Sequence, residues 1–382
     1  MKKTISLFIM AFLGASLVLG GCGGSTSGTA TQAPLAAQET SALQETASAQ
    51  EETSSVDSSD ADQSDAKQEK VPELTGDSGA KLTCQAGIRV GSLKGPTSMG
   101  LVSLMDKSSK GETSNVYEFT MAGKADELVG KIANGDLDIA LVPANVASVL
   151  YNKTQGNVTV LDINTLGVLY VVASDDSITS MADLKGRTVY MTGKGTTPEY
   201  VMNYLIKENG LSASDVDLQF KSEATEVASI LKQDSSAIGV LPQPFATAAC
   251  IQNEALKTVL DLTEQWNLLY KESGSMLVTG VTLVRSDFLR ENRAPVEEFL
   301  KDHAESALFA TGHVEEAAAL VAAQGIVEKA PIAQKALPYC NIVCMTGQEM
   351  KDALSGYLST LMEQDPKSIG GKLPGDDFYY MP

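Results

Sequence analysis

Two short loops carry the residue types in this chain that could bind a ligand. Lys94-Gly95-Pro96-Thr97 follows an apolar segment at residues 88–93, and Lys194-Gly195-Thr196-Thr197 follows another at 188–192. A helical pattern begins directly after each loop. The free N–H groups at a helix start, beside Gly95 or Gly195, attract an anion or the polar edge of a ligand. The two loops therefore predict recognition of a small polar or anionic molecule.

The same loops have a simpler interpretation, which stays open on sequence grounds. Thr197 stands before Pro198, a pattern that fits an N-cap followed by proline at the first helical position. Each threonine could then serve only its own helix. Neither loop has the Gly-x-x-x-x-Gly-Lys order of a nucleotide-binding loop.

Signals for catalysis are absent from the sequence. It contains no Gly-x-Ser-x-Gly, no His-Glu-x-x-His and no Cys-x-x-Cys pair. His303 and His313 are ten residues apart and so do not share a helix face, which favours structural roles. We therefore expect no enzyme, no metal and no cofactor. Apart from Cys22, the cysteines are expected to be mostly buried thiols, with a disulfide left open: Cys84, Cys250, Cys340 and Cys344.

The loops are expected to lie between strands and helices that alternate along most of the chain. Apolar segments at 88–93, 138–142 and 237–241 predict buried strands. Amphipathic segments between them predict helices, and the chain from 294 onward is expected to be chiefly helical. This alternation predicts an α/β fold with mostly parallel sheets covered by helices on both faces.

Part of this pattern occurs twice. Residues 88–98 align with 188–198 at an offset of 100, and 138–143 align with 237–242 at an offset of 99. Each aligned pair is a strand followed by a loop. Ligands of open α/β sheets bind at the carboxyl ends of strands. Two units built on one plan would therefore place two binding loops opposite each other.

The N-terminus has the features of an export signal. Lys2 and Lys3 precede an apolar run at 4–18, which ends in Leu19-Gly20-Gly21-Cys22. The run is short for a transmembrane helix. We expect residues 1–21 to be a cleaved signal and Cys22 to be lipidated, with an ordinary signal as the alternative. The protein would then work outside the cytoplasmic membrane.

The next segment, residues 22–80, is polar and acidic. Residues 23–80 contain eleven acidic residues and only two basic ones, Lys67 and Lys70, and large apolar residues are almost absent. Such a composition predicts a disordered, extended tether. Residues 81–382 carry a net charge of −12, which argues against a nucleic-acid partner.

Several of these features together resemble a known family. The lipobox-like Cys22, the loop Lys94-Gly95-Pro96-Thr97 and the segments Gly135-Asp136-Leu137-Asp138-Ile139-Ala140 and Asp183-Leu184-Lys185-Gly186-Arg187 are similar to substrate-binding proteins of ABC transporters. Within that family, the chain resembles the group that binds taurine and other sulfonates, nitrate and thiamine-precursor pyrimidines. The resemblance covers about residues 88–382, and none of its motifs specifies the ligand.

The resemblance implies a periplasmic-binding-protein fold of type II with a ligand cleft between two lobes. Residues 85–174 and 281–382 would form lobe 1, and 175–280 would form lobe 2. The partners implied are a small-molecule ligand, an ABC permease with its ATPase, and the membrane through the lipid anchor, with the protein itself a monomer. Ligand contacts carried over to this chain, together with the loop glycines, are Gly95, Thr97, Ser98, Asn145, Tyr170, Gly195, Thr196, Thr197, Gln243 and Trp266.

Two other functions use the same cleft. The protein could be a membrane-anchored ligand sensor, or an enzyme like the pyrimidine-synthesis and menaquinone-pathway relatives of this fold. The candidate loops contain no arginine that could clamp a sulfonate or carboxylate. A heterocycle and a small organic anion are therefore both compatible with the sequence.

Overall fold

The computed structural model describes residues 87–270 and 275–382. The predicted signal at 1–21, the lipidation site Cys22, the acidic segment at 22–80 and Cys84 lie outside the described residues. Within the described ranges, no helix is both long and apolar enough to cross a membrane.

Six strands form the first sheet, in the order β11-β4-β10-β3-β1-β2. Their bounds are Gly87–Leu93 (β1), Val116–Ala122 (β2), Ile139–Pro143 (β3), Val158–Leu166 (β4), Val278–Arg285 (β10) and Ile342–Met345 (β11). Five strands form the second sheet, in the order β7-β6-β8-β5-β9. Their bounds are Leu169–Ala173 (β5), Thr188–Met191 (β6), Asp217–Phe220 (β7), Ile238–Pro242 (β8) and Lys257–Asp261 (β9).

The internal repeat predicted from the sequence is confirmed by this topology. β1 and β3 occupy the same places in the first sheet as β6 and β8 in the second, and each set has the next strand at its edge. The predicted α/β class is also confirmed, but neither sheet is purely parallel. β10 and β11 run against the other four strands of their sheet, and β5 runs against the other four of its own.

The reversed strands β5 and β10 enter each sheet from the other one. Leu169, the first residue of β5, pairs with Pro242, the last residue of β8. Gly280, near the start of β10, pairs with Pro143, the last residue of β3. Both connections therefore reach the sheets at the end where β3 and β8 have their C-terminal residues. A strand that enters a sheet at the C-terminal end of its neighbours must run antiparallel to them.

Strand pairing moves the crossings between the sheets away from the predicted lobe boundaries. The sequence places residues up to 174 in lobe 1, but β5 pairs with β8 and β9 of the second sheet. It places residues 278–280 in lobe 2, but they belong to β10 of the first sheet. The first crossing is therefore at Gly167-Val168, and the second lies between Tyr270 and Val278. Apolar composition alone identifies strands without showing which sheet they join.

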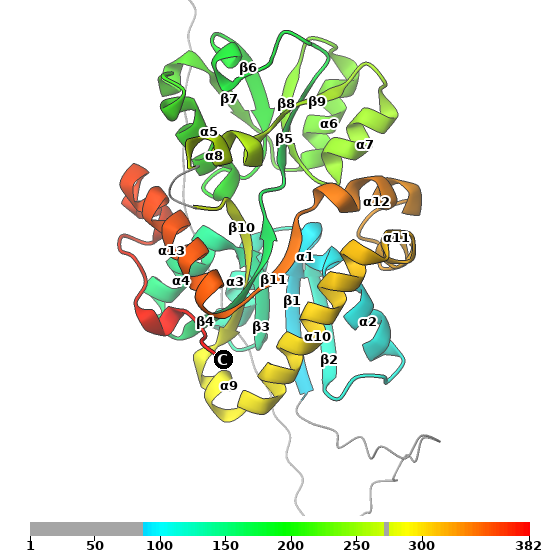
Figure 1. Cartoon of the computed structure of the whole chain (residues 1–382), viewed down its shortest axis with the longest axis vertical. Helices are drawn as coiled ribbons and strands as arrows, with labels where there is room; N and C mark the ends of the chain where they lie inside the picture. The colour runs from blue at the N-terminus through cyan, green and yellow to red at the C-terminus, as the bar shows by residue number, and fades with distance from the viewer. Residues whose placement is uncertain (1–86, 271–274) are drawn as a thin grey trace, which may run out of the picture. The chain divides into compact units, whose positions relative to one another are not determined.

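Helices cover the sheets (Figure 1). The α-helices are Pro96–Met99 (α1), Val102–Ser109 (α2), Ala125–Ala133 (α3), Ala144–Lys153 (α4), Thr197–Glu208 (α5), Ala224–Gln233 (α6), Phe245–Gln252 (α7), Leu262–Leu269 (α8), Ser286–Glu291 (α9), Arg293–Gly312 (α10), Val314–Ala323 (α11), Ala330–Ala336 (α12) and Gly347–Gln364 (α13). Short 3-10 turns are Met181–Leu184, Ala213–Asp215, Leu337–Tyr339, Pro366–Ile369 and Asp376–Phe378.

Burial on both sheet faces explains the apolar strands. Along β3, Ile139 and Leu141 pack in a cluster with α2 and α10, whereas Ala140 and Val142 pack in the cluster that includes α3 and α4. Successive side chains point to opposite faces. A strand covered on both faces therefore has no polar position, as the sequence pattern indicates.

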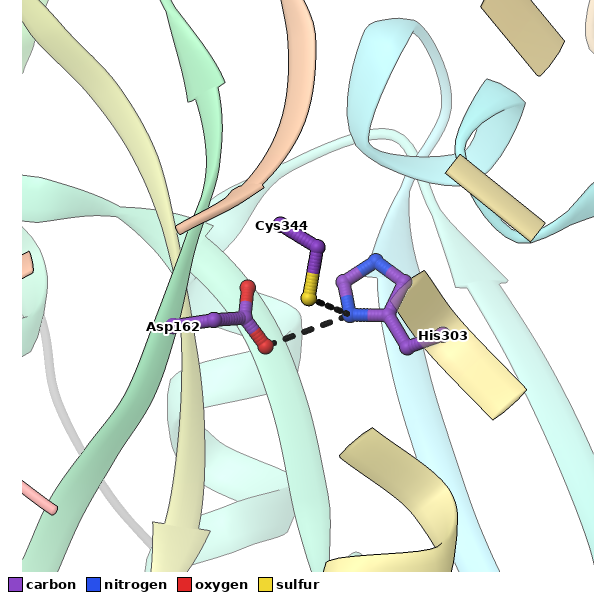
Figure 2. A group of neighbouring side chains, drawn as sticks. All are labelled: Asp162, His303 and Cys344. Atoms are coloured by element: carbon purple, nitrogen blue, oxygen red, sulfur yellow. Dashed lines mark hydrogen bonds and ion pairs between the residues drawn. The ribbon is translucent and has the colours of Figure 1, made fainter. Parts of the chain in front are cut away.

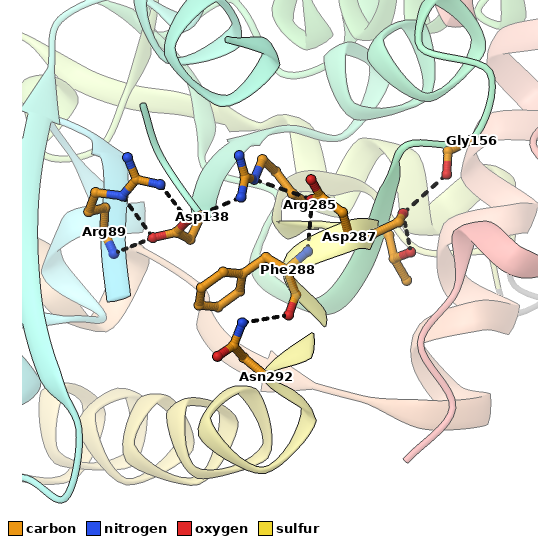
Figure 3. A network of polar contacts seen from close by, with 9 residues as sticks. Arg89, Asp138, Gly156, Arg285, Asp287, Phe288 and Asn292 are labelled. Atoms are coloured by element: carbon orange, nitrogen blue, oxygen red, sulfur yellow. Dashed lines mark hydrogen bonds and ion pairs between the residues drawn. The ribbon is translucent and has the colours of Figure 1, made fainter. Parts of the chain in front are cut away.

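The family motif around Asp138 has a structural role at the opposite end of these strands (Figure 3). The Asp138 carboxylate belongs to a residue that is 2% exposed, and it accepts hydrogen bonds from the main-chain N–H of Arg89 at 2.9 Å and from its Nε and Nη2 at 2.9 and 2.6 Å. Arg285 Nη2 lies 3.5 Å from the same carboxylate. Asp138 thus joins the starts of β1 and β3 to the end of β10.

The second family motif shapes the turn before β6. Arg187 donates from Nη2 to Asp175 at 2.6 Å, and Ser177 donates to the same carboxylate from its N–H and its hydroxyl. Hydrogen bonds from the Ser177 hydroxyl and from Arg187 lower the pKa of Asp175 to about 2. This motif therefore holds the chain between β5 and β6 in place.

A pH titration can test this turn. We expect carboxyl-carbon NMR to give Asp175 a pKa of about 2 in the folded protein, against an ordinary 3.8. Because the folded-state pKa is depressed, the contribution of Asp175 to stability is present above about pH 4 and is lost as the pH falls toward 2. Ser177→Ala should raise this pKa, whereas Ser214→Ala should leave it unchanged. A wild-type value near 3.8 would contradict the hydrogen-bonded turn.

Candidate functional site

The loop after β1 is closed by its own side chains. Gly95 has a φ of 143°, which glycine adopts freely, and Pro96 opens α1. Thr97 donates its hydroxyl to the Leu93 carbonyl at 2.7 Å. Ser98 is fully buried, 2.6 Å from the Leu93 carbonyl oxygen and 2.6 Å from the Ser92 hydroxyl. The hydroxyls expected to meet a ligand are therefore engaged within the loop itself.

The loop before α5 differs from the sequence prediction. Thr197 is the first residue of the helix, and Thr196, not Thr197, is its N-cap. Pro198 is consequently the second helical residue. Thr196 donates its hydroxyl to the Gly193 carbonyl at 2.9 Å, so it forms no side-chain cap. The prediction was one residue late because proline is tolerated throughout the first turn, where N–H groups have no helical acceptor.

The expected anion site at this helix start is partly filled by the protein. The Gly195 N–H donates to the carboxylate of Glu199 in the first turn of α5. A negative side chain here interacts favourably with the helix dipole. An anionic ligand at the Gly195 loop would therefore have to displace the Glu199 carboxylate from this N–H.

Asn145, at the start of α4, reaches from the first sheet to the second. Its side chain is buried, and its Nδ2 donates to the Ser368 carbonyl at 3.1 Å and to the Gly195 carbonyl at 3.5 Å. Its Oδ1 accepts from the Thr197 hydroxyl at 3.4 Å. The two bonds to the α5 loop are at the long limit for hydrogen bonds and are therefore weak. The structure thus brings together Asn145, Gly195 and Thr197.

Trp266 lies in an aromatic cluster beside this group. It is fully buried and packs against Tyr204, Tyr270 and Tyr357, with ring-centre distances of 4.9, 5.1 and 5.6 Å. Burial raises the pKa of Tyr357, and the nearby Thr197 hydroxyl partly offsets this increase. Within the described part of the chain, Trp266 Nε1 has no hydrogen-bond partner, and the Tyr357 hydroxyl has only the nearby Thr197 hydroxyl. Buried polar atoms without partners are rare and point to a missing ligand or water.

Tyr170 and Gln243 form a separate group at the first crossing. The Tyr170 hydroxyl donates to the Tyr339 carbonyl at 2.9 Å, and burial raises its pKa. Gln243 follows β8 and its Oε1 accepts from the Thr247 hydroxyl at 2.8 Å. Its main-chain N–H donates to the Val168 carbonyl at 3.1 Å. Both side chains are buried, and their hydrogen-bond partners are residues outside the Asn145 group.

A cavity of about 720 Å³ lies between helices of both sheets, a volume in the range of small-molecule sites. The loop after β1 contributes Lys94, and α6 and α7 contribute Lys232 and Phe245. The segment from α11 to α12 contributes Ile326 and Glu328. Apart from Lys94, the sequence reasoning missed this lining. The lining residues come from four distant segments, so no local pattern could have identified them.

The sequence matches one family. Residues 110–336 match the family described as ABC transporter, phosphonate, periplasmic substrate-binding protein. A comparison with curated proteins gives no match.

Solved structures share the fold. An ABC transporter protein from Parabacteroides distasonis is 22% identical, with 77% of this chain and 98% of that chain covered and a TM-score of 0.64. The aliphatic sulphonate-binding protein of Escherichia coli is 15% identical, with 78% and 92% covered and a TM-score of 0.61. The alkanesulfonate-binding protein of Xanthomonas axonopodis, bound to MOPS, is 12% identical, with 76% and 94% covered and a TM-score of 0.57. These similarities support the periplasmic-binding-protein fold.

Proposed function

This chain belongs to the phosphonate family of periplasmic substrate-binding proteins of ABC transporters, and on this premise we propose that it captures a small organic anion where its two sheets meet. The first lobe of the proposal comprises residues 87–166 and 278–382, and the second comprises 169–270. The ligand would be released unchanged to a membrane permease, and a lipid at Cys22 would hold the receptor at the outer face of the membrane.

One observation carries the proposed binding site. The Asn145 side-chain amide donates to the Gly195 carbonyl at 3.5 Å and accepts from the Thr197 hydroxyl at 3.4 Å. A ligand oxygen and a ligand donor inserted here would make shorter bonds with the same groups. The Trp266 indole N–H, which lacks a partner among the described residues, would gain one.

The proposed ligand class is a phosphonate or sulfonate. The family description names phosphonate, and the two sulfonate-binding structures have the same fold. The candidate loops lack arginine, so hydroxyl, amide and indole groups would hold the oxygens. The 720 Å³ cavity lined by Lys94 and Lys232 is a separate feature, because its lining includes neither Asn145 nor Trp266.

A thermal-shift screen of the full chain tests the ligand class. We expect methylphosphonate, 2-aminoethylphosphonate, taurine or MOPS to raise the melting temperature, with nitrate and a pyrimidine as comparison ligands. A ligand at about 100 times its dissociation constant adds about 2.7 kcal/mol, a shift of several degrees. Stabilisation by the pyrimidine alone would contradict the proposed class.

The binding site is tested by removing the Asn145 amide. Asn145→Ala should weaken binding of the ligand found in the screen by about 1–3 kcal/mol, because buried ligand atoms would lose their partners. Isothermal titration calorimetry measures this change. Thr196→Ala, in the α5 loop that Asn145 contacts, is the control: the Thr196 hydroxyl donates to the Gly193 carbonyl, so this variant should leave affinity within about twofold. Equal affinity of wild type and Asn145→Ala would reject the site.

A further inference from the structure

A second chemical group lies buried in the first sheet, apart from the Asn145 site. His303 on α10 places Nδ1 3.2 Å from Asp162 Oδ2 of β4 and 3.9 Å from Cys344 Sγ of β11 (Figure 2). Asp162 and His303 are fully buried, and Cys344 is partly buried and a free thiol. The three ligand atoms lie within 4.8 Å of one another.

The arrangement differs from a nucleophilic triad. In such a triad the thiol and the carboxylate contact opposite ring nitrogens, so that the imidazole relays a proton between them. Here both contact Nδ1, while Nε2 has no partner within the described ranges. The group therefore lacks the relay geometry of a triad, and its atoms instead converge on one point.

That convergence fits a tetrahedral metal ion. Zinc binds sulfur at about 2.3 Å and nitrogen or oxygen at about 2.0–2.2 Å, which places its ligand atoms about 3.3–3.6 Å apart. The observed N–O and N–S separations of 3.2 and 3.9 Å depart from these values by a few tenths of an ångström. The third separation, between the Asp162 and Cys344 ligand atoms, is within 4.8 Å, so a bound metal would draw Cys344 toward the other two ligands.

The surroundings hold the carboxylate in place. Thr282 donates its hydroxyl to Asp162 Oδ1 at 2.8 Å, and Asn164 Nδ2 donates to the Thr282 oxygen at 3.1 Å. Partners of this kind orient metal ligands and strengthen binding. Because Thr282 occupies Oδ1, the other carboxylate oxygen of Asp162, Oδ2, stays available to bind a metal. His303 is likewise fixed, by packing of its ring against Phe299.

We propose that Asp162, His303 and Cys344 bind one zinc-type divalent metal ion. The thiol proton and the proton shared by His303 and Asp162 leave to solvent as the metal binds. Three protein ligands leave one position of the tetrahedron for a further ligand. The metal would join β4, α10 and β11, and so would fix the C-terminal segment to the first sheet.

Cobalt binding to the full chain tests this proposal. After treatment with a chelator, we expect one equivalent of Co²⁺ to give tetrahedral visible bands and a thiolate-to-cobalt charge-transfer band, and Zn²⁺ to displace them. Zn²⁺ should also raise the melting temperature. Cys344→Ser should abolish the charge-transfer band and weaken Zn²⁺ binding at least about tenfold, the lower end of the loss seen even for partners behind the ligands.

Cys340 provides the matched control. It is a buried free thiol four residues away, whose Sγ faces Met99 Sδ at 3.7 Å. Cys340→Ser should keep the cobalt spectrum, and circular dichroism should show that both variants fold. The absence of a cobalt spectrum in folded wild type would overturn the proposal. A charge-transfer band that persists in Cys344→Ser would also overturn it, because another cysteine would then bind the metal.

Discussion

Replacing Trp266 by alanine is expected to lower the free energy of unfolding by about 3–5 kcal/mol, the range for large aromatic side chains removed from a packed core. The indole is fully buried among Tyr204, Tyr270 and Tyr357. Alanine would leave a cavity that three large rings cannot easily collapse to fill. Urea denaturation followed by circular dichroism measures the effect, because the variant lacks the only tryptophan of the chain.

A neighbouring residue of the same helix gives the control. Leu268 on α8 is 57% exposed. Leu268→Ala should therefore change stability by no more than about 0.5 kcal/mol. Trp266→Phe keeps most of the packing but removes the indole N–H, so it should retain most of the stability while weakening ligand binding. Unchanged stability in Trp266→Ala would show that the aromatic cluster does not support the core.

Replacing Asp138 by alanine is expected to cost about 2–3 kcal/mol. Removing one partner from a fully buried ion pair costs about 3–5 kcal/mol, but side chains that reach solvent recover part of that loss. Arg89 and Arg285 are 40% and 21% exposed in their side chains. The Arg89 main-chain N–H also loses its acceptor. Chemical denaturation of the variant measures the difference.

An exposed ion pair tests whether burial causes the loss of stability expected for Asp138→Ala. Asp376 lies 2.7 Å from Lys351, and its side chain is 92% exposed. Asp376→Ala should therefore cost much less stability than Asp138→Ala. Asp138 joins the strand starts, away from the loops that follow β3 and β8, so ligand affinity of folded Asp138→Ala should equal that of wild type. Similar losses of stability for both aspartates would contradict the role given to Asp138.

Regular local patterns predicted most of the elements correctly. The alternating clusters of β3, the apolar run of β8 and the amphipathic α3 are evident because each face of these segments meets a constant environment. The helical pattern that begins after the first loop is not one helix but two, separated at Gly100-Leu101, where a Cβ on Gly100 would lie 3.1 Å from Ile342 Cγ2. The short strand β11, which includes Ile342, was not predicted. Both errors depend on a contact between residues that are far apart in the sequence.

The sequence by itself determined the α/β class, the repeated strand and loop plan, and the family. These properties follow from local periodicity and from short motifs that the folded chain need not bring together. Only the tertiary structure decided which sheet each crossing strand joins, that Asn145 meets Gly195 and Thr197, and that Asp162, His303 and Cys344 converge on one point. Such contacts depend on sheet order and on the docking of distant helices, and no spacing along the chain specifies those distances.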